Sequence, residues 1–423
     1  MLNAWKFLLR RDLPPNSLKQ VNFSVFGLGD SSYALFNAMA KKLTQRMLDL
    51  GANLFQKVGL GDAQHDFGYE GEFDPWLQEL WPSLKLLLPP VHPMLVEAPS
   101  TSNLAPPVYK VQVSQARANG AGFSALEHLP SPLGAFESHP KARLASMTKN
   151  TQLTPAGHFQ DTRHLSLTFE PNSDGSGYKA GDILMVQPQN NRDQLVLPFL
   201  SLIGLAPETQ LQIAIDPDQL GQVSATSLIQ FPAGQPISAL ELFSFWLNLS
   251  EPPSRYFCEV MGTFLSQKAN KSQEDVMKSE KLLHFASKTA DGKSEYFGYC
   301  VRERRDVLTV FKDFGITNEV PLAYLIQGIG RQRPREYSIS SSYRTDARGQ
   351  AVVDLTMLVT EYETKFKRQV SGVCSGWLKS VAPKQGDPIP VWLKAGTMTF
   401  PEGKPLIMVG PGTGVAAFRA VIQ

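Results

Sequence analysis

The sequence has little of what marks secreted or membrane chains. Its 423 residues contain only three cysteines, Cys258, Cys300 and Cys374, which lie far apart and form no CxxC pair. That number and spacing argue against a disulfide framework and a structural zinc site, and they favour a reducing, cytoplasmic compartment. No apolar run approaches the roughly 18 to 20 residues of a membrane span. The first twelve residues are unlike a secretory signal, because charge follows a very short apolar stretch.

An excess of one charge is also lacking. Lys and Arg total 41 against 39 Asp and Glu, which gives a net charge of +2. No bulk field therefore draws the chain to nucleic acid or to anionic lipid. A hydrophobic content of 42% with 19% charged residues is typical of a folded enzyme rather than a disordered chain. At about 150 residues per domain, the length suggests two to three domains.

The first 88 residues alternate strand-like and helix-like segments. Residues 21–29 form a short β-branched and aromatic run, and residues 31–51 carry apolar side chains at helical spacing. Residues 52–62 are strand-like again, and residues 73–88 favour a further helix. This order predicts a doubly wound α/β domain, in which ligands bind beyond the carboxyl ends of parallel strands. Both expected strands end in a glycine-rich loop with an acid, GLGDSSY and GLGD.

Proline and small polar residues dominate residues 89–107, a composition that marks a linker. From Val108 short strand-like runs follow, then helical segments, and strand-like runs resume at EYSISSS. The simplest architecture for this order is a β-barrel over residues 108–400, interrupted by a helical insertion at about 193–325. A last strand is expected at PLIMVG, before GPGTG and a helix, within residues 401–423.

Three short motifs carry candidate chemistry. GPGTG at 410–414 precedes a helix, and such glycines let a backbone approach a phosphate at the helix N-terminus. REYSISSS at 335–342 sets an arginine and a tyrosine on one face of a strand, and these can clamp a pyrophosphate and stack on a planar ring. SGVCSGWL at 371–378 opens a helix with backbone amides and a hydroxyl. Each motif alone is also consistent with plain structure: a connection, a barrel strand and a capped helix.

In this order and spacing, the motifs resemble the FAD domain of the ferredoxin–NADP reductase family, with its R-x-Y-S strand, G-x-[ACT]-[ST] helix start and GPGTG loop. YKAGDILMVQPQN is similar to that family's Y-x-x-GD strand. The insertion, with PSRYFCEVM and RERRDVL, resembles the diflavin branch, in which a flavodoxin-like FMN domain comes first. GLGDSSYALFNAMAKKL is similar to the FMN-ring loop of that branch, most of all in the NADPH-dependent diflavin reductases that serve cytosolic iron–sulfur cluster assembly. The resemblance covers essentially all 423 residues.

The resemblance implies an electron route and the residues that hold its cofactors. Members of the family pass hydride from NADPH to FAD, then single electrons to FMN and on to an acceptor, here an anamorsin-type iron–sulfur protein. For FAD it implies Arg335 on the pyrophosphate, Tyr337 stacked on the ring and Ser338 near the reactive nitrogen, which makes Ser338 the candidate catalytic residue. The other residues implied for FAD are Arg304, Glu336, Gly372, Val373, Cys374 and Ser375. Cys374 is then a turn residue and not a nucleophile.

For FMN the resemblance implies a loop and one acid: Leu28, Gly29, Asp30, Ser31, Ser32, Tyr33, Ala34, Leu35, Phe36, Asn37 and Asp62. Tyr33 is the expected stacking aromatic, although GLGD at 59–62 is also consistent with a mere strand-end turn. For NADPH the resemblance implies Gly412 and Thr413. Ala417 stands where the family has a proline, and Ala63 where relatives often carry a second acid. No metal site, catalytic triad or nucleic-acid motif is expected.

Several family features are not found at either end of the sequence. Residues 1–88 correspond to a partial flavodoxin-like domain without its first three strands and phosphate loop, and residues 401–423 correspond to the beginning of an NADP subdomain. We therefore expect an incomplete diflavin reductase that keeps FAD far better than FMN and shows little NADPH-dependent activity. A cytochrome P450 reductase-like and a methionine synthase reductase-like enzyme are alternatives. A non-catalytic flavin-binding or interaction module is the alternative from another class.

Overall fold

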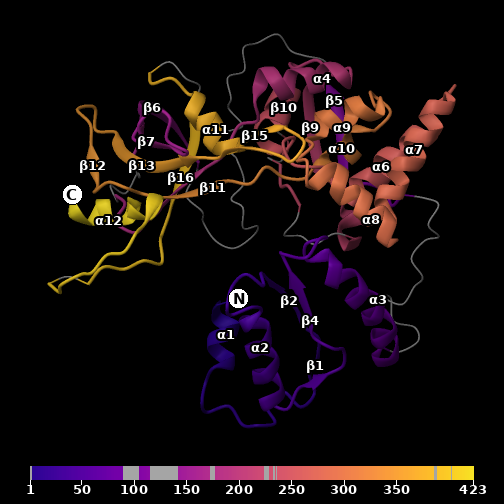
Figure 1. Cartoon of the computed structure of the whole chain (residues 1–423), viewed down its shortest axis with the longest axis horizontal. Coiled ribbons are helices and arrows are strands. Elements are labelled where there is room, and N and C mark those ends of the chain that lie inside the picture. The colour runs from indigo at the N-terminus through magenta and orange to yellow at the C-terminus, as the bar shows by residue number, and fades with distance from the viewer. Residues whose placement is uncertain are drawn as a thin grey trace. The chain divides into compact units, whose positions relative to one another are not determined.

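Figure 1 shows the chain as a computed structural model, which describes residues 2–88, 104–114, 142–171, 177–222, 228–231, 234, 236–384, 388–401 and 403–423. Its contacts divide it into two compact units. The first comprises residues 1–104 and 287–297, and the second comprises residues 105–286 and 298–423. Across the described residues, no helix is both long and apolar enough to cross a lipid bilayer. Most of the linker predicted at 89–107 lies outside the described residues.

Parallel strands form the centre of the first unit. β1 (Asn22–Phe23) pairs with β3 (Asn53–Leu54), and β2 (Phe26–Gly29) pairs with β4 (Gly59–Asp62), both in parallel. Parallel strands need a crossover, and α2 (Ala38–Asp49) supplies it. The other helices of this unit are α1 (Leu2–Leu8), α3 (Glu70–Leu87) and α8 (Ala290–Tyr296). This arrangement confirms the α/β prediction.

Element boundaries in the first unit differ from the sequence-based expectation. The strands expected over 21–29 and 52–62 are each interrupted, at residues 24–25 and 55–58. The helix expected from residue 31 begins only at Ala38, because residues 31–37 form a loop. Asp30 accepts hydrogen bonds from the amide and the hydroxyl of Ser32, which holds this loop in a turn instead of a helix. Asn37 ends the loop in the left-handed conformation, with φ of 52°.

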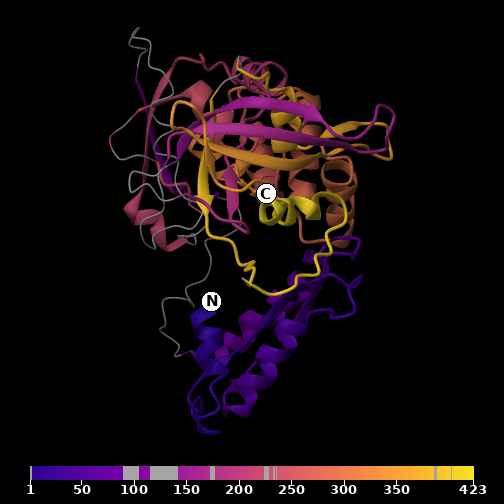
Figure 2. The ribbon, with the colours of Figure 1, turned by 90° about the vertical axis from the view of Figure 1, so that its left-hand side faces the viewer.

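A seven-stranded antiparallel sheet is the centre of the second unit (Figure 2), with the strand order β11-β8-β16-β6-β7-β13-β12. Its members are β6 (Arg143–Gln152), β7 (Asp161–Phe169), β8 (Ile183–Val186), β11 (Arg335–Ser338), β12 (Arg344–Thr345), β13 (Ala351–Val359) and β16 (Ile389–Lys394). A bridge between Ile339, directly after β11, and Leu355 of β13 curls the sheet toward the predicted barrel. Its core includes Leu165, Leu167 and Val391, all fully buried, and each such side chain contributes about 1.5–3 kcal/mol.

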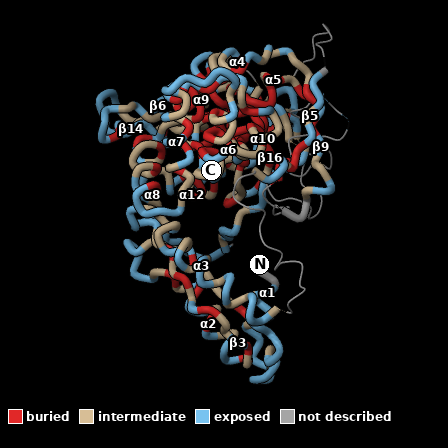
Figure 3. The backbone as a smooth tube through the Cα atoms, turned by 90° about the vertical axis from the view of Figure 1, so that its right-hand side faces the viewer, coloured by how far each residue is buried: buried red, intermediate tan, exposed pale blue. Residues whose placement is uncertain are grey.

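The insertion packs helices beside this sheet, and many buried residues, red in Figure 3, lie around α4, α6, α9 and α10. Its helices in this unit are η3 (Arg192–Val196), α4 (Leu197–Leu202), η4 (Pro217–Gln222), α5 (Ala239–Glu241), η5 (Leu242–Trp246), α6 (Arg255–Ser266), α7 (Gln273–Ala286), η6 (Phe297–Val301), α9 (Val307–Phe314) and α10 (Leu322–Ile329). Side-chain caps begin several of them: for example, Ser254 accepts from the amide of Phe257, and Asp306 accepts from that of Thr309.

The insertion predicted to be helical contains strands as well as helices. The insertion also contains β9 (Gln210–Ile215) and β10 (Ile237–Ser238), which form a three-stranded sheet with β5 (Tyr109–Ser114) in the order β10-β9-β5. β5 is thus not the first strand of the barrel, as its position in the sequence suggested. Its backbone pairs with β9 over six residues, because β9 offers a complementary antiparallel edge.

The last part of the chain contains a hairpin and two helices. β14 (Glu361–Glu363) pairs with β15 (Gln369–Ser371), and this hairpin leads directly into α11 (Val373–Ser380). The short turn η7 (Gly412–Gly414) precedes α12 (Val415–Ile422). The strand expected at PLIMVG, residues 405–410, does not form. No described strand pairs with it, and its apolar side chains are exposed, Ile407 to 96% and Val409 to 80%.

Candidate functional site

The strand β11 and the helix α11 meet through two side chains. Arg335 and Tyr337 are half-buried while Glu336 and Ser338 are exposed, which confirms the predicted alternation along the strand. The Tyr337 ring packs against the barrel core, and its hydroxyl hydrogen-bonds with the thiol of Cys374 at the start of α11. The structure therefore brings the REYS and GVCS motifs together. They are far apart in the sequence.

The environment of Cys374 disfavours the reactive form of its thiol. Burial raises the pKa of its thiol to about 12, and the nearby Tyr337 hydroxyl and Arg335 guanidinium offset this only in part. A thiolate, and not a thiol, is the reactive form of cysteine. Burial also raises the pKa of Tyr337, with Cys374 adding to the effect. Both groups stay protonated at neutral pH, as a structural pair.

The N-terminus of α11 is built from backbone. Its N-cap is Gly372, which has no side chain to accept from the first-turn amides. The Gly372 amide donates to the Thr360 carbonyl at 2.8 Å, and the Thr360 amide donates to Ser375 Oγ at 3.1 Å. A Cβ at Gly372 would lie 2.6 Å from Ser375 Oγ and 2.9 Å from Thr360 Cβ. Only glycine fits at this position. No N-cap side chain therefore caps the backbone amides of Val373 and the residues after it. We call this uncapped helix start the cradle, and it is of the kind that binds phosphate.

A cavity of about 810 Å³ adjoins this cradle. Gly372, Val373 and Trp377 line one side, and Asn190 and Asn191, from the loop after β8, line the other. The hairpin before α11 also presents an exposed aromatic, Tyr362 of β14, directly opposite Val370. The motif comparison did not single out Tyr362 or the two asparagines. The sequence does contain a signal for Tyr362, because this aromatic residue lies between two acids, Glu361 and Glu363, shortly before SGVCSG.

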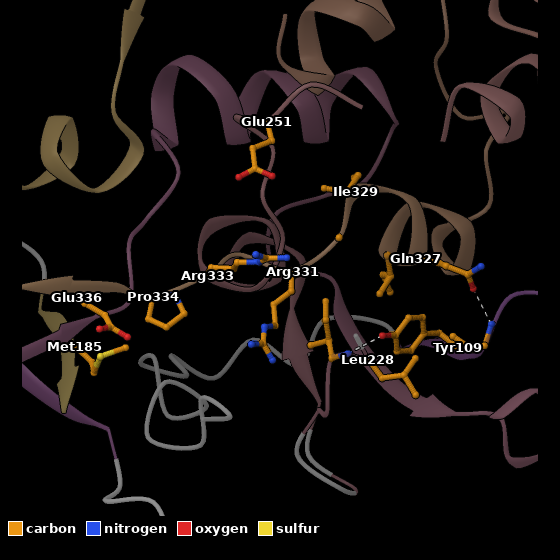
Figure 4. A pocket seen from close by; sticks show the side chains of 14 residues that line it. Tyr109, Met185, Leu228, Glu251, Gln327, Ile329, Arg331, Arg333, Pro334 and Glu336 are labelled. Carbon is orange, nitrogen blue, oxygen red and sulfur yellow. Dashed lines mark hydrogen bonds between the residues drawn. The ribbon is translucent and has the colours of Figure 1, made fainter. Parts of the chain in front are cut away.

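Two other residues predicted for FAD contact other parts of the second unit. Arg304 is exposed and left-handed, with φ of 48°, in a loop held beside the hairpin because Thr364 Oγ1 donates to Glu303 Oε2 at 2.7 Å. Glu336 pairs with Lys394 at 2.7 Å. It also lines a separate cavity of about 550 Å³, which Figure 4 shows with Arg331, Arg333 and Met185.

In the first unit, the two predicted FMN loops lie side by side at the carboxyl ends of β2 and β4. The Ser31 amide donates to Asp62 at 2.9 Å, and the Ala63 amide donates to the Gly29 carbonyl at 2.8 Å. The buried Asn37 closes the loop from behind by donating from Nδ2 to the Gly61 carbonyl at 3.0 Å. The structure thus joins the ten-residue loop, residues 28–37, with Asp62, as the doubly wound pattern predicted.

Charge and shape in these loops are well defined. The pKa of Asp30 is lowered chiefly by the Ser32 hydroxyl, and that of Asp62 chiefly by hydrogen bonding from Ser31. Both acids therefore stay ionised. Beside them, Leu28, Tyr33 and other apolar residues line a cavity of about 800 Å³. Exposed fractions of 72% for Leu28, 70% for Tyr33 and 79% for Leu35 leave an apolar surface that a flat ring can cover.

The predicted nucleotide turn lies before α12. Gly412 is left-handed, with φ of 59°, and Thr413 follows it in a single 3₁₀ turn. A Cβ on Gly410 would approach the Gly414 carbonyl oxygen and the Phe418 ring to 2.7 Å each. The turn therefore needs glycine at two of its positions, for conformation at Gly412 and for space at Gly410.

The residues predicted for FAD and those predicted for FMN lie in parts of the chain that match two protein families. The model of the FAD binding domain matches residues 136–377, and the model of flavodoxin matches residues 1–76. Proteins called NADPH-dependent diflavin oxidoreductase 1 are similar along the whole chain: those of Bos taurus and Danio rerio are each 36% identical, over 427 and 435 residues. The chain belongs to the diflavin oxidoreductases.

Within this family, a plant member from Arabidopsis thaliana is 34% identical over 99% of the chain. The chain spans 67% of the length of the cattle and zebrafish proteins. The matches confirm the resemblance seen in the motifs and make the protein an oxidoreductase whose family uses FAD, FMN and NADPH. The structure fits FAD in particular, because the bare cradle at Gly372 and the ring of Tyr337 lie in the part matched by the FAD binding domain.

Proposed function

We propose that this diflavin oxidoreductase carries electrons from NADPH through FAD and FMN to an anamorsin-type iron–sulfur protein, in iron–sulfur protein assembly in the cytoplasm. The contact between Tyr337 and Cys374 carries the FAD part, because it places an aromatic ring beside a glycine-built helix start. The acceptor rests on the likeness of the 28–37 loop and its surroundings to the FMN-ring loop of the assembly reductases. Few cysteines and balanced charge favour the compartment.

The proposal gives each group of residues a separate task. When bound, FAD supplies the conversion of a two-electron hydride donor into single electrons. Tyr337 covers the flavin ring, Arg335 and the amides after Gly372 hold the pyrophosphate, and Ser338 is presented on the exposed edge of β11. Tyr362 is a candidate platform for the adenine, because it is exposed in the hairpin that leads into this cradle.

The FMN loops have a parallel task. Tyr33, exposed beside Leu28, offers a stacking surface, and the ionised Asp30 and Asp62 fix the loop backbone through Ser31 and Ser32. Because these acids already accept hydrogen bonds within the protein, their role is to shape the loop. Thr413 contributes a hydroxyl to a nucleotide phosphate at the start of α12.

The test is reconstitution of the full chain with FAD and FMN, followed by rapid-mixing absorbance with NADPH and with candidate acceptors. We expect an oxidised anamorsin-type iron–sulfur protein to be reduced only when NADPH and both flavins are present, and to be reduced slowly, because the sequence predicts that this chain keeps FAD far better than FMN. Microsomal cytochrome P450 and cobalamin-bound methionine synthase serve as the competing acceptors. Faster reduction of either would favour the corresponding alternative enzyme, and a bound flavin that NADPH never reduces would favour a binding module.

A variant pair tests the FAD site itself. Tyr337→Ala removes the ring beside Cys374 and should weaken FAD binding by roughly tenfold to a hundredfold. Tyr343→Ala is the matched control, because Tyr343 is 40% exposed and its ring contacts Tyr178. Flavin released during gel filtration, measured by fluorescence, gives the comparison. Equal FAD loss in both variants would contradict the assignment.

A further inference from the structure

The nucleotide turn at Gly412–Gly414 is poorly held by the chain that leads to it. The preceding residues 404–411 form no strand, and Ile407 and Val409 are largely exposed. Within the described residues, the turn is instead connected to the barrel through α12 and through contact with β13 (Figure 1). Contacts that hold α12 on the barrel therefore also hold the turn in place.

Apolar packing of α12 is modest. The buried residues of the helix are Ala416, Ala417 and Ala420. An alanine methyl group buries little apolar surface, so these contacts alone give a weak hold. Ala417 is also the position at which the family motif has a proline. A polar contact made by the same helix therefore determines the position of the turn more strongly than this alanine packing does.

Arg419 supplies that anchor. Its Nη1 donates to the Ser340 carbonyl at 3.1 Å and to His164 Nδ1 at 3.3 Å, and its Nη2 lies 3.6 Å from Asp354 Oδ2. Ser340 is fully buried, and the Asp354 side chain is 3% exposed. One side chain of α12 thus contacts three groups of the barrel, from β7, from β13 and from the segment after β11. Ser340 lies two residues beyond Ser338.

Hydrogen bonds within the barrel hold the groups that Arg419 contacts. Ser166 Oγ donates to Asp354 Oδ1 at 2.7 Å, and His164 Nε2 lies 3.3 Å from Ser166 Oγ. His164 can accept from Arg419 at Nδ1 only as the neutral ring with its proton on Nε2, and that proton then points to Ser166. Arg344 adds a second cation on Asp354, at 2.8 Å. A buried carboxylate with these donors is a fixed target for a guanidinium.

We infer that Arg419 is a positioning residue: through Asp354, His164 and Ser340 it fixes the nucleotide-binding turn relative to the flavin strand β11. This inference rests on the proposed function of that turn. No contact between Arg419 and a cofactor is needed, since the effect passes through the backbone of α12 to Gly412 and Thr413. The expected consequence is weaker nucleotide binding when the anchor is lost, with FAD binding retained.

The test compares Arg419→Gln with Arg344→Gln in the full chain loaded with FAD. Both variants remove one guanidinium from Asp354, but Arg344 lies on β12 and has no contact with α12 among its described interactions. Hydrogen exchange of peptides covering 412–422 reports the hold on the turn without any nucleotide. The NADP⁺ dissociation constant, from the flavin difference spectrum, reports the site. Arg419→Lys keeps the charge and loses the forked geometry.

We expect Arg419→Gln to speed exchange in 412–422 by about tenfold and to weaken NADP⁺ binding by a similar factor. Arg344→Gln should change each by less than about twofold, with Arg419→Lys between them. Unchanged exchange in Arg419→Gln, equal effects in both glutamine variants, or faster exchange with unchanged NADP⁺ affinity would each overturn the inference. If the unaltered chain binds no NADP⁺, the proposed nucleotide site itself is wrong, and the exchange rates still decide whether Arg419 is the anchor.

Discussion

Replacement of the buried Glu241 by glutamine should stabilise the second unit above neutral pH and leave it nearly unchanged in acid. Glu241 is 7% exposed, and its neighbours Leu242 and Phe243 are fully buried. The indole Nε1 of Trp246 donates to Glu241 Oε1 at 3.4 Å, and this long hydrogen bond offsets little of the cost of burying the carboxylate. Burial accordingly raises the pKa of this carboxyl from 4.5 to about 7.

The sign and size follow from proton linkage. Because the folded-state pKa is raised, the folded protein binds more protons than the unfolded chain between pH 4.5 and about 7. The contribution of Glu241 to stability is therefore fully present below pH 4.5 and is lost as the pH rises through 7. Each pKa unit corresponds to about 1.4 kcal/mol, so the ionised group costs about 3 kcal/mol at pH 8. Glutamine keeps an oxygen for Trp246 and carries no charge.

Urea unfolding of the Glu241→Gln variant and the unaltered chain at pH 5, 6, 7 and 8 measures this difference. The gain in free energy of unfolding should rise from under about 1 kcal/mol at pH 5 to about 3 kcal/mol at pH 8, where it levels off. The exposed Glu208, changed to glutamine, is the control for the substitution itself and should change the free energy of unfolding by less than about 0.5 kcal/mol. A difference of the same size at every pH, or one that shrinks as the pH rises, would refute the argument.

Three further predictions concern the sites. Gly372→Ala should weaken FAD binding at least about tenfold in an equilibrium titration, because its Cβ meets Ser375 Oγ at 2.6 Å; Gly298→Ala, whose Cβ meets nothing within 4 Å, should not. Asn37→Ala should cost the first unit about 1–3 kcal/mol in thermal or urea unfolding, because it removes the buried bond to the Gly61 carbonyl and leaves a left-handed residue strained. The pKa of His164 is lowered chiefly by burial; Asp354 raises it, and Arg419, Lys149 and Arg344 lower it further. The free energy of unfolding should therefore fall as the pH drops below 6.5, because the unfolded chain then binds more protons than the folded protein. His164→Gln should reduce that slope between pH 7.5 and 5.5.

The sequence was most informative where chemistry depends on the backbone. Glycine at 372 and alternation at Arg335 and Tyr337 predicted a helix cradle and a strand face, and both features are present. Such patterns are local, so a single sequence contains them. The contact between Tyr337 and Cys374, in contrast, depends on how β11 and α11 pack, which no local pattern specifies.

Misplaced elements have a similar cause. PLIMVG has the composition of a strand, yet strand formation needs a partner edge, and no described strand lies beside it. β5 was assigned to the barrel from its position in the chain, whereas β9 provides its edge. The cluster around Asp354 escaped detection because Arg419, His164 and Ser340 come from three distant segments and form no motif.

The pairing of β5 with β9 also has a mechanical consequence. Val108, at the entry to β5, donates its amide to Gln327 Oε1 and accepts from the Asp216 amide, so the start of the second unit is tied to the insertion. A pull on the residues before Val108 is carried first by the six residue pairs between β5 and β9. Neither β11, which carries Tyr337, nor the segment at Gly372 pairs with β5. Tension that enters at Val108 therefore meets these pairs before it reaches the seven-stranded sheet.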